Sequence, residues 1–256
     1  MTAAPWDLLE TAHTVLVAHA HPDDESLATG ALLATLARAG TRVVLVTATR
    51  GEEGEVVPGS IPEGEDRPLD EIRAHEIDAA CAHLGITERH MLGEPPALAP
   101  GAEPRRYRDS GMRWVRKGLA GPAETAGPAS FTHRPRKDAA DDLVALIEQA
   151  RPDLLLGYDD AGSYGHPDHV QAHHVTVAAA ERSGVPMVQF ASEPDDPAFG
   201  WRDLPGVADA VEAALRCYRT QLTVLGRDGA GTGEAVLIRH VGGQDDRIAM
   251  RSGLRA

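Results

Sequence analysis

Strand-like apolar runs alternate with amphipathic helical stretches along the first 190 residues, and this alternation restricts the fold more than any other feature. The runs typical of strands cover residues 14–20, 41–48, 89–92, 153–158 and 185–190. Between them we predict helices at residues 27–39, 69–84, 138–150 and 167–182. This order predicts an α/β protein with a Rossmann-like, mostly parallel sheet and helices on both of its faces.

The rest of the chain has a weaker pattern. Residues 93–137 are rich in proline and glycine and far exceed ordinary loop length, so we predict a long loop over the active site. Later we expect a helix over residues 207–225 and a strand over residues 234–240, with the last dozen residues frayed. We expect a single domain over residues 1–256, of which residues 191–256 form a variable C-terminal part.

Charge and composition exclude several classes of partner. The 256 residues carry a formal net charge of −14, and no basic patch runs along the sequence, which argues against nucleic acid and anionic membranes. No apolar stretch approaches the about 18 residues that a membrane span needs, and the first residues lack the cationic pattern of a leader, so we expect neither a membrane span nor export. Two cysteines, Cys81 and Cys217, cannot form a disulfide framework. We therefore expect a cytoplasmic protein with a small-molecule substrate.

Two short segments rich in metal-binding side chains follow strand-like runs. The first comes after residues 14–20 and the second after residues 153–158, and they read His21-Pro22-Asp23-Asp24-Glu25 and His166-Pro167-Asp168-His169. If the five strands have the order 3-2-1-4-5, these two strands are neighbours at the switch point of the sheet, where ligands bind at the carboxyl ends. The sequence therefore predicts one metal site there, built from both segments.

Two imidazoles and one carboxylate are the donor set of a catalytic zinc with an open fourth position. The first segment has one carboxylate more than this set requires, so either Asp23 or Asp24 can bind the ion while the other acts as general base. The second segment has a spare histidine for a leaving group or an oxyanion, and Asp168 can orient a nearby imidazole. His173, four residues after His169, is interpreted as pocket wall or solvent-facing. No glycine fingerprint for nucleotide phosphates occurs.

The two segments together resemble the LmbE-like, or PIG-L, superfamily of zinc-dependent N-deacetylases, which act largely on N-acetylglucosamine-containing compounds. The resemblance covers roughly residues 14–190 and is nearest to the mycothiol-pathway deacetylase and conjugate-amidase branch. Further stretches that carry it are Gly51-Glu52-Glu53-Gly54-Glu55, Arg73, Arg108-Asp109-Ser110-Gly111-Met112 and Tyr164-Gly165.

The resemblance implies a metal set and a base. His21, Asp24 and His169 would hold one Zn²⁺ per chain, with Fe²⁺ or another divalent ion as the alternative. Asp23 would be the base that deprotonates the metal-bound water.

The resemblance also implies roles for residues around the ion. Tyr164 would polarise the amide carbonyl, and His166 would assist the tetrahedral intermediate or protonate the amine, with Asp168 tuning His166. The substrate contacts would be made to sugar or cyclitol hydroxyls by Arg73, Arg108 and Asp109.

The predicted function is therefore a zinc-dependent amide hydrolase that removes acetyl from an N-acetylglucosamine-type amino-sugar conjugate. One alternative is an amidase that cleaves a larger amide, such as a mycothiol-type thiol conjugate, because His19-Ala20-His21 and Ser26 are similar to the conjugate amidases. A non-haem iron oxygenase shares the two-histidine, one-carboxylate set. Asp23 argues against it, since oxygen activation needs no base directed at water. A sugar-binding module without catalysis is the third alternative, and the intact Asp23 argues against this one too.

Overall fold

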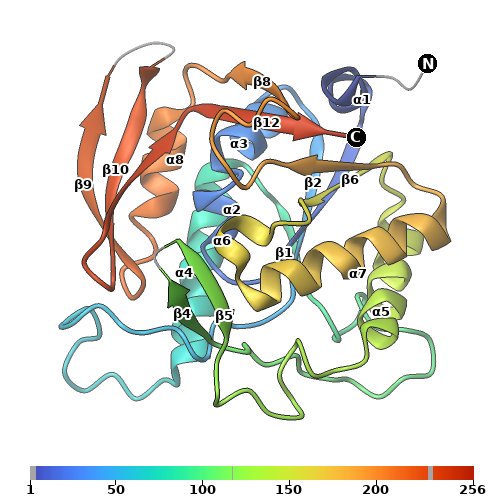
Figure 1. Cartoon of the computed structure of the whole chain (residues 1–256), viewed down its shortest axis with the longest axis horizontal. Helices are drawn as coiled ribbons and strands as arrows, with labels where there is room; N and C mark the ends of the chain where they lie inside the picture. Colours follow the sequence, from blue (N-terminus) through green and yellow to red (C-terminus); the bar gives the residue numbers. More distant parts are fainter. Residues whose placement is uncertain (1–3, 117, 230–232) are drawn as a thin grey trace.

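The computed structural model describes residues 4–116, 118–229 and 233–256. Within these residues a seven-stranded sheet in the order β3-β2-β1-β6-β7-β12-β8 forms the centre of the molecule (Figure 1). Five of its strands are parallel: β1 (Thr14–His19), β2 (Arg42–Thr47), β3 (Glu88–Met91), β6 (Leu154–Tyr158) and β7 (Met187–Phe190). The predicted order of the five strands is confirmed, and β1 and β6 are neighbours at the switch point.

Strand β1 lies in the middle of the sheet and is buried on both faces. Val15, Leu16 and Val17 are completely buried, as expected for a continuous β-branched and apolar run in a parallel sheet. Val15 pairs with Val43 of β2 on one side and with Leu154 of β6 on the other. The carboxyl ends of β1 and β6 are therefore fixed next to each other.

Helices cover the sheet in two layers. α5 (Arg136–Ala150) and α7 (Pro167–Ser183) pack together on one side, and α3 (Gly30–Arg38), α4 (Leu69–Leu84) and α8 (Ala208–Leu215) pack together on the other (Figure 1). Gly85 at φ 78° and Gly184 at φ 72° end α4 and α7 in the left-handed conformation that suits glycine. Three short helices complete the set: α1 (Pro5–Thr11), α2 (Asp24–Leu27) and α6 (Gly162–Gly165).

The C-terminal part differs from the prediction. The helix expected over residues 207–225 ends at Leu215, and β9 (Leu222–Asp228) follows in an antiparallel three-stranded sheet with β10 (Ala235–His240) and β11 (Asp245–Ala249). Four buried residues have the spacing of one helix face, although they come from a helix, a turn and a strand: Val211, Leu215, Tyr218 and Leu222.

The expectation that the last residues fray is wrong. Strand β12 (Arg251–Arg255) enters the central sheet antiparallel to β7 and pairs on its other side with β8 (Gly200–Asp203). Leu254 is completely buried there. The C-terminal part therefore closes one edge of the main sheet.

The stretch 93–137 is only partly irregular. It contains an antiparallel hairpin of β4 (Met112–Arg116) and β5 (Leu119–Pro122), and Tyr107 and Phe131 anchor it in the interior with no exposed surface. None of the helices in the described part of the chain is long and apolar enough to cross a membrane.

Candidate active site

The two histidine segments meet at the carboxyl ends of β1 and β6. His21 Nδ1 lies 3.2 Å from His169 Nε2. The Asp24 carboxylate contacts both rings, with Oδ1 3.2 Å from His169 Nε2 and Oδ2 3.3 Å from His21 Nδ1. The structure therefore brings His21, Asp24 and His169 together, although 148 residues separate the two histidines.

These three side chains fit one divalent ion. Ligand atoms that share a tetrahedral ion at about 2.1 Å lie roughly 3.4 Å apart, close to the separations seen here. The second ring nitrogens are engaged as they must be if the first ones point at an ion: His21 Nε2 lies 3.2 Å from Asp168 Oδ2, and His169 Nδ1 lies 3.2 Å from Ser163 Oγ. All three residues are buried.

A wider donor cluster surrounds this set. His166 stacks on His169 with ring centres 4.7 Å apart and meets His21 edge-on at 4.6 Å. Its ligand atom lies within 4.8 Å of those of His21 and His169. Asp24 nevertheless fits the third position better than His166, because its two oxygens contact both other donors directly.

Tyr158, the last residue of β6, supports Asp24. Its hydroxyl donates a 2.7 Å hydrogen bond to Asp24 Oδ2, and its ring stacks on His169 with centres 4.6 Å apart. The backbone N–H of His21 donates to the same carboxylate oxygen at 2.8 Å. Burial alone raises the pKa of Asp24, but His169 and His21 hold that pKa well below its ordinary value. Sequence reasoning missed Tyr158, whose position at the end of the strand before the second motif was the available signal.

Asp23 has a strained backbone and a free side chain. Its φ of 115° and ψ of −29° lie in the left-handed region, which a non-glycine residue adopts only when its surroundings enforce it. No described residue donates a hydrogen bond to its carboxylate. Burial, together with the charges of Asp24 and Glu25, raises the pKa of Asp23 well above its ordinary value. An unpaired carboxylate of high proton affinity beside the donor set has the properties of a general base.

A buried network beneath the first loop holds this conformation. Glu25, completely buried, accepts a 3.2 Å hydrogen bond from the Asp23 backbone N–H. Its other oxygen accepts hydrogen bonds from Ser26 Oγ at 2.5 Å and from Tyr218 Oη at 2.6 Å. Gln221 Nε2 donates to the Pro22 carbonyl at 2.8 Å. Sequence reasoning missed Tyr218 and Gln221 because they are nearly 200 residues away, in the C-terminal part.

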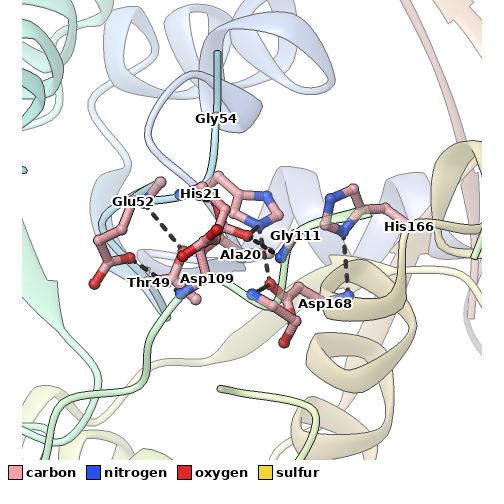
Figure 2. Close-up of polar contacts among 12 residues, drawn as sticks. Ala20, His21, Thr49, Glu52, Gly54, Asp109, Gly111, His166 and Asp168 are labelled. Atoms are coloured by element: carbon pink, nitrogen blue, oxygen red, sulfur yellow. Dashed lines mark hydrogen bonds and ion pairs between the residues drawn. The ribbon is translucent and has the colours of Figure 1, made fainter. Parts of the chain in front are cut away.

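Asp168 has a different partner from the one expected. Its carboxylate accepts from Ser110 N at 2.8 Å and contacts His21 Nε2, whereas His166 is reached only by the Asp168 backbone N–H, 3.2 Å from Nδ1. The reason is the first turn of α7, where the His166 ring caps the helix. Figure 2 shows His21 between Asp109 and Asp168, and His166 above the start of the helix. Asp168 therefore orients His21 directly, and the expected tuning of His166 through the Asp168 carboxylate is not what this geometry provides.

Burial, followed by the nearby His21 and His169, lowers the pKa of His166 to about 2. The ring is therefore neutral, and because Nδ1 accepts the Asp168 N–H, its proton lies on Nε2. A neutral imidazole in this state offers a hydrogen-bond donor.

Arg73 is not exposed to a substrate. The side chain is 1% exposed and its guanidinium donates to the carbonyls of Gly51, Gly54 and Glu55. A Cβ atom at Gly51 or Gly54 would lie 2.9 or 2.6 Å from Arg73 Nη1, so glycine at both positions makes room for the guanidinium. The expected direct contact of Arg73 with sugar hydroxyls is thus replaced by a role in holding the loop after β2.

Asp109 and Arg108, the other two residues expected to contact the substrate, differ in burial. Asp109 is 6% exposed, with Oδ1 3.6 Å from His21 Nε2 and 2.8 Å from the Gly111 N–H. Burial raises the pKa of Asp109, but His21 outweighs it and the net pKa is far below its ordinary value. Arg108 is half-exposed and lies 3.4 Å from Glu53. Asp109 therefore reaches the site, and Arg108 lies outside it.

A buried His-His-Asp set at the switch point of a doubly wound sheet defines a class of protein: a Rossmann-like α/β protein whose site has a donor set that fits a metal ion. The PIG-L family model, described as GlcNAc-PI de-N-acetylase, matches residues 16–180. The chain belongs to this family, and the resemblance inferred from the motifs is confirmed.

Two similar curated proteins carry the same name. A 1D-myo-inositol 2-acetamido-2-deoxy-alpha-D-glucopyranoside deacetylase from Nocardioides sp. is 45% identical over 176 residues, 67% of this chain and 55% of the relative. The protein of the same name from Actinosynnema mirum is 36% identical over 252 residues, 85% of this chain and 83% of that one. The chain thus spans little more than half of the Nocardioides relative. N,N'-diacetylchitobiose deacetylase from Pyrococcus horikoshii shares the fold, with a TM-score of 0.57 at 18% identity over 84% of this chain and 73% of that chain.

Proposed function

We propose that the chain is a zinc-dependent amide hydrolase that removes the acetyl group from an N-acetylglucosamine-type amino-sugar conjugate. The observation that carries the proposal is the convergence of His21, Asp24 and His169 with the unpaired carboxylate of Asp23 beside them. The names of the relatives from Nocardioides and Actinosynnema add the substrate class, an acetamido sugar linked to an inositol. Water and amide react to give acetate and the free amine.

His21, Asp24 and His169 would hold the zinc. Two imidazole nitrogens and one carboxylate oxygen are donors that zinc prefers in hydrolytic sites. When bound, the ion supplies Lewis acidity that lowers the pKa of water and polarises a carbonyl. Asp168 and Ser163 fix the ring orientations of the two histidines by hydrogen bonds to their second nitrogens.

Asp23 is assigned to accept the proton of the attacking water, because its carboxylate has no competing donor and its pKa is raised by burial. The neutral His166 is assigned to donate a hydrogen bond from Nε2 to the oxyanion that forms from the amide carbonyl. Tyr164 is 40% exposed, and its ring lies 5.9 Å from that of His166, which suits a phenol that meets the same oxygen from the solvent side. Asp109 would contact a substrate hydroxyl.

We also propose that residues 1–256 act as one unit in the cytoplasm. β12 belongs to the central sheet and Tyr218 contacts the first loop, which supports the single unit. Cys81 and Cys217 are both free thiols, which supports a reducing compartment.

The test uses the purified, zinc-loaded chain with N-acetylglucosamine, its methyl, phenyl and inositol glycosides, and N-acetyl amino acids. Equimolar release of acetate and free amine from the glycosides is expected, with N-acetyl amino acids poor substrates. Release of a longer acid from N-acylated conjugates, without release of acetate, would instead support the larger-amide amidase. Oxygen consumption by the Fe²⁺-loaded chain, without amine release, would support the oxygenase alternative.

A further inference from the structure

Exposed aromatic side chains gather at the entrance to the metal-ligand cluster. Four large hydrophobic residues of the described chain are exposed: Trp114 (50%), Val115 (61%), Tyr164 (40%) and Leu225 (45%). Trp114 and Tyr164 lie against each other, with ring centres 5.4 Å apart and planes tilted by 41°. Single exposed apolar residues need no explanation, but adjoining aromatic rings beside a catalytic site mark a surface that binds something.

The position of Trp114 is fixed by the hairpin that carries it. Trp114 pairs with Ala120 across β4 and β5, and β5 lies against α6. Gly165 forms this contact: a Cβ atom there would lie 2.8 Å from Leu119 Cδ1, and its φ of 76° also requires glycine. Figure 1 shows the hairpin next to α6. The hairpin is thus joined to the turn that carries Tyr164 and His166.

The rings form a path that leads away from the donor cluster. The Tyr164 ring lies 5.7 Å from His169 and 5.9 Å from His166, and the ring of Trp114 lies 5.4 Å from that of Tyr164. In the proposed function, an amide that reacts beside His169 would bring its sugar ring near Tyr164. In a 2-acetamido sugar the anomeric carbon is adjacent to the carbon that bears the amide. The group attached to the anomeric carbon would then be within reach of Trp114.

We propose that Trp114 binds the ring attached to the anomeric carbon of the substrate, and so selects ring-bearing amino-sugar conjugates over small ones. This inference rests on the proposed function. The face of an indole is electron-rich, and the C–H groups on one face of a cyclitol or a sugar, like those at the edge of an aryl ring, carry complementary partial charge. The aromatic pair provides an apolar surface without charge, which suits such a ring in a protein of net charge −14. Trp114 is a specificity-determining residue rather than a catalytic one.

The kinetic test compares the zinc-loaded wild type with Trp114→Ala, Trp114→Phe and Val115→Ala. For each, kcat/KM is measured on the methyl and phenyl glycosides of N-acetylglucosamine. Trp114→Ala should lower the preference for the phenyl glycoside about tenfold, mainly through KM, since a stacked ring contributes about a factor of ten in binding. Trp114→Phe should restore most of the preference. Val115→Ala is the matched control, because Val115 lies on the same hairpin over Gly121 and should leave the preference unchanged.

A second measurement does not depend on turnover. Of the three tryptophans, Trp114 is half-exposed, Trp6 is buried, and Trp201 lies on β8 beneath the Arg251 guanidinium. Binding of the deacetylated phenyl glycoside should therefore change the tryptophan fluorescence of the wild type through Trp114. Trp114→Phe should lose that change while Val115→Ala retains it.

The outcomes separate the two proposals. If the wild type hydrolyses neither glycoside, the proposed function is wrong, and the inference about Trp114 is overturned with it when the fluorescence is also silent. If hydrolysis proceeds but Trp114→Ala keeps the full phenyl preference, only the inference about Trp114 is overturned. A change of oligomeric state in Trp114→Ala, with unchanged preference, would show that a second copy of the chain covers this surface instead.

Discussion

The loops after β1 and after β6 both deliver a histidine and an aspartate to one site, yet their surroundings differ. Beneath the first loop lies a buried hydrogen-bond network in which Glu25 and Tyr218 hold the Asp23 backbone. The second loop is open to solvent at Tyr164 and carries positive φ angles at Ser163 and Gly165.

This difference indicates that the two loops have different roles in the proposed site. In the proposed assignment the first loop supplies two of the three metal donors and the base, and distant parts of the chain hold it in position. In the same assignment the second loop supplies the third donor and would face the substrate at Tyr164, and β5 of the hairpin packs against α6 beside it. Buried residues thus fix the position of the first loop, whereas the second loop would contact the substrate at the protein surface.

The largest expected effect concerns the point where the loops meet. His21→Ala and His169→Ala should each lose the bound metal and reduce hydrolysis to background, because donors from both loops contact one position. Elemental analysis of purified variants checks this. His174→Ala, on α7 but only partly buried, is the control and should keep the metal. Full metal content in both ligand variants would show that the loops do not share an ion.

Within the first loop, adjacent carboxylates should behave differently. Asp23→Asn should keep the metal and lower kcat by roughly 10² or more, the size of a lost general base. Asp24→Asn should weaken metal affinity by more than the about 10- to 100-fold that loss of an outer-shell partner costs, because its carboxylate is assigned as a direct ligand beside both histidines. Metal titrations beside kcat measurements separate the two. Equal metal loss in both variants would contradict the assignment.

Acid sensitivity tests the interior beneath the first loop. His19, 1% exposed, is bonded to Tyr158 and Thr29, and burial lowers its pKa from 6.5 to about 4. Between pH 6.5 and 4 the unfolded chain binds a proton at this residue that the folded chain does not, so the free energy of unfolding decreases as pH falls through that window. The contribution is about 3 kcal/mol.

Denaturant unfolding of the wild type and of His19→Asn, at several pH values between 7 and 4, measures this contribution. The variant should have the shallower dependence on pH. His13→Asn, at an exposed position just before β1, should keep the wild-type slope. Parallel curves for wild type and His19→Asn would refute the buried, neutral state of His19.

The sequence predicts those features of the fold and the site that depend on residues close together in the chain. Periodicity identified β1, β2, β6 and β7 because each is a local apolar run, whereas β3 is a polar, partly buried edge strand with a weak signal. The strand order followed from topology. Strand β12 was missed because the short run Arg251–Arg255 has no alternation and is defined by its pairing with β7, over 60 residues away. The contact partners of the site residues could not be predicted for the same reason. Arg73 and Asp168 stand in recognisable motifs, but which group each one contacts depends on loops that meet only in the folded chain.

The smallest expected effect is a change in kcat that distinguishes a tyrosine that supports the site from one that supports only the fold. Tyr218 and Tyr107 are both completely buried, and each donates one hydrogen bond to a buried carboxyl group, Glu25 at 2.6 Å and Asp142 at 2.7 Å. Replacing either by phenylalanine should lower the free energy of unfolding by about 1.5–3 kcal/mol, the usual cost of a lost bond to a charged group.

Only Tyr218→Phe should also lower kcat, by a few-fold, because Glu25 links Tyr218 to the Asp23 backbone whereas Asp142 supports the long loop. Its KM and metal content should be unchanged, since neither donors nor substrate contacts are altered. The comparison needs urea unfolding and steady-state kinetics on the same two variants. Equal losses of kcat would mean that both tyrosines act through the stability of the whole protein. The hydrogen bond from Tyr218 in the C-terminal part would then have no specific effect on the first loop.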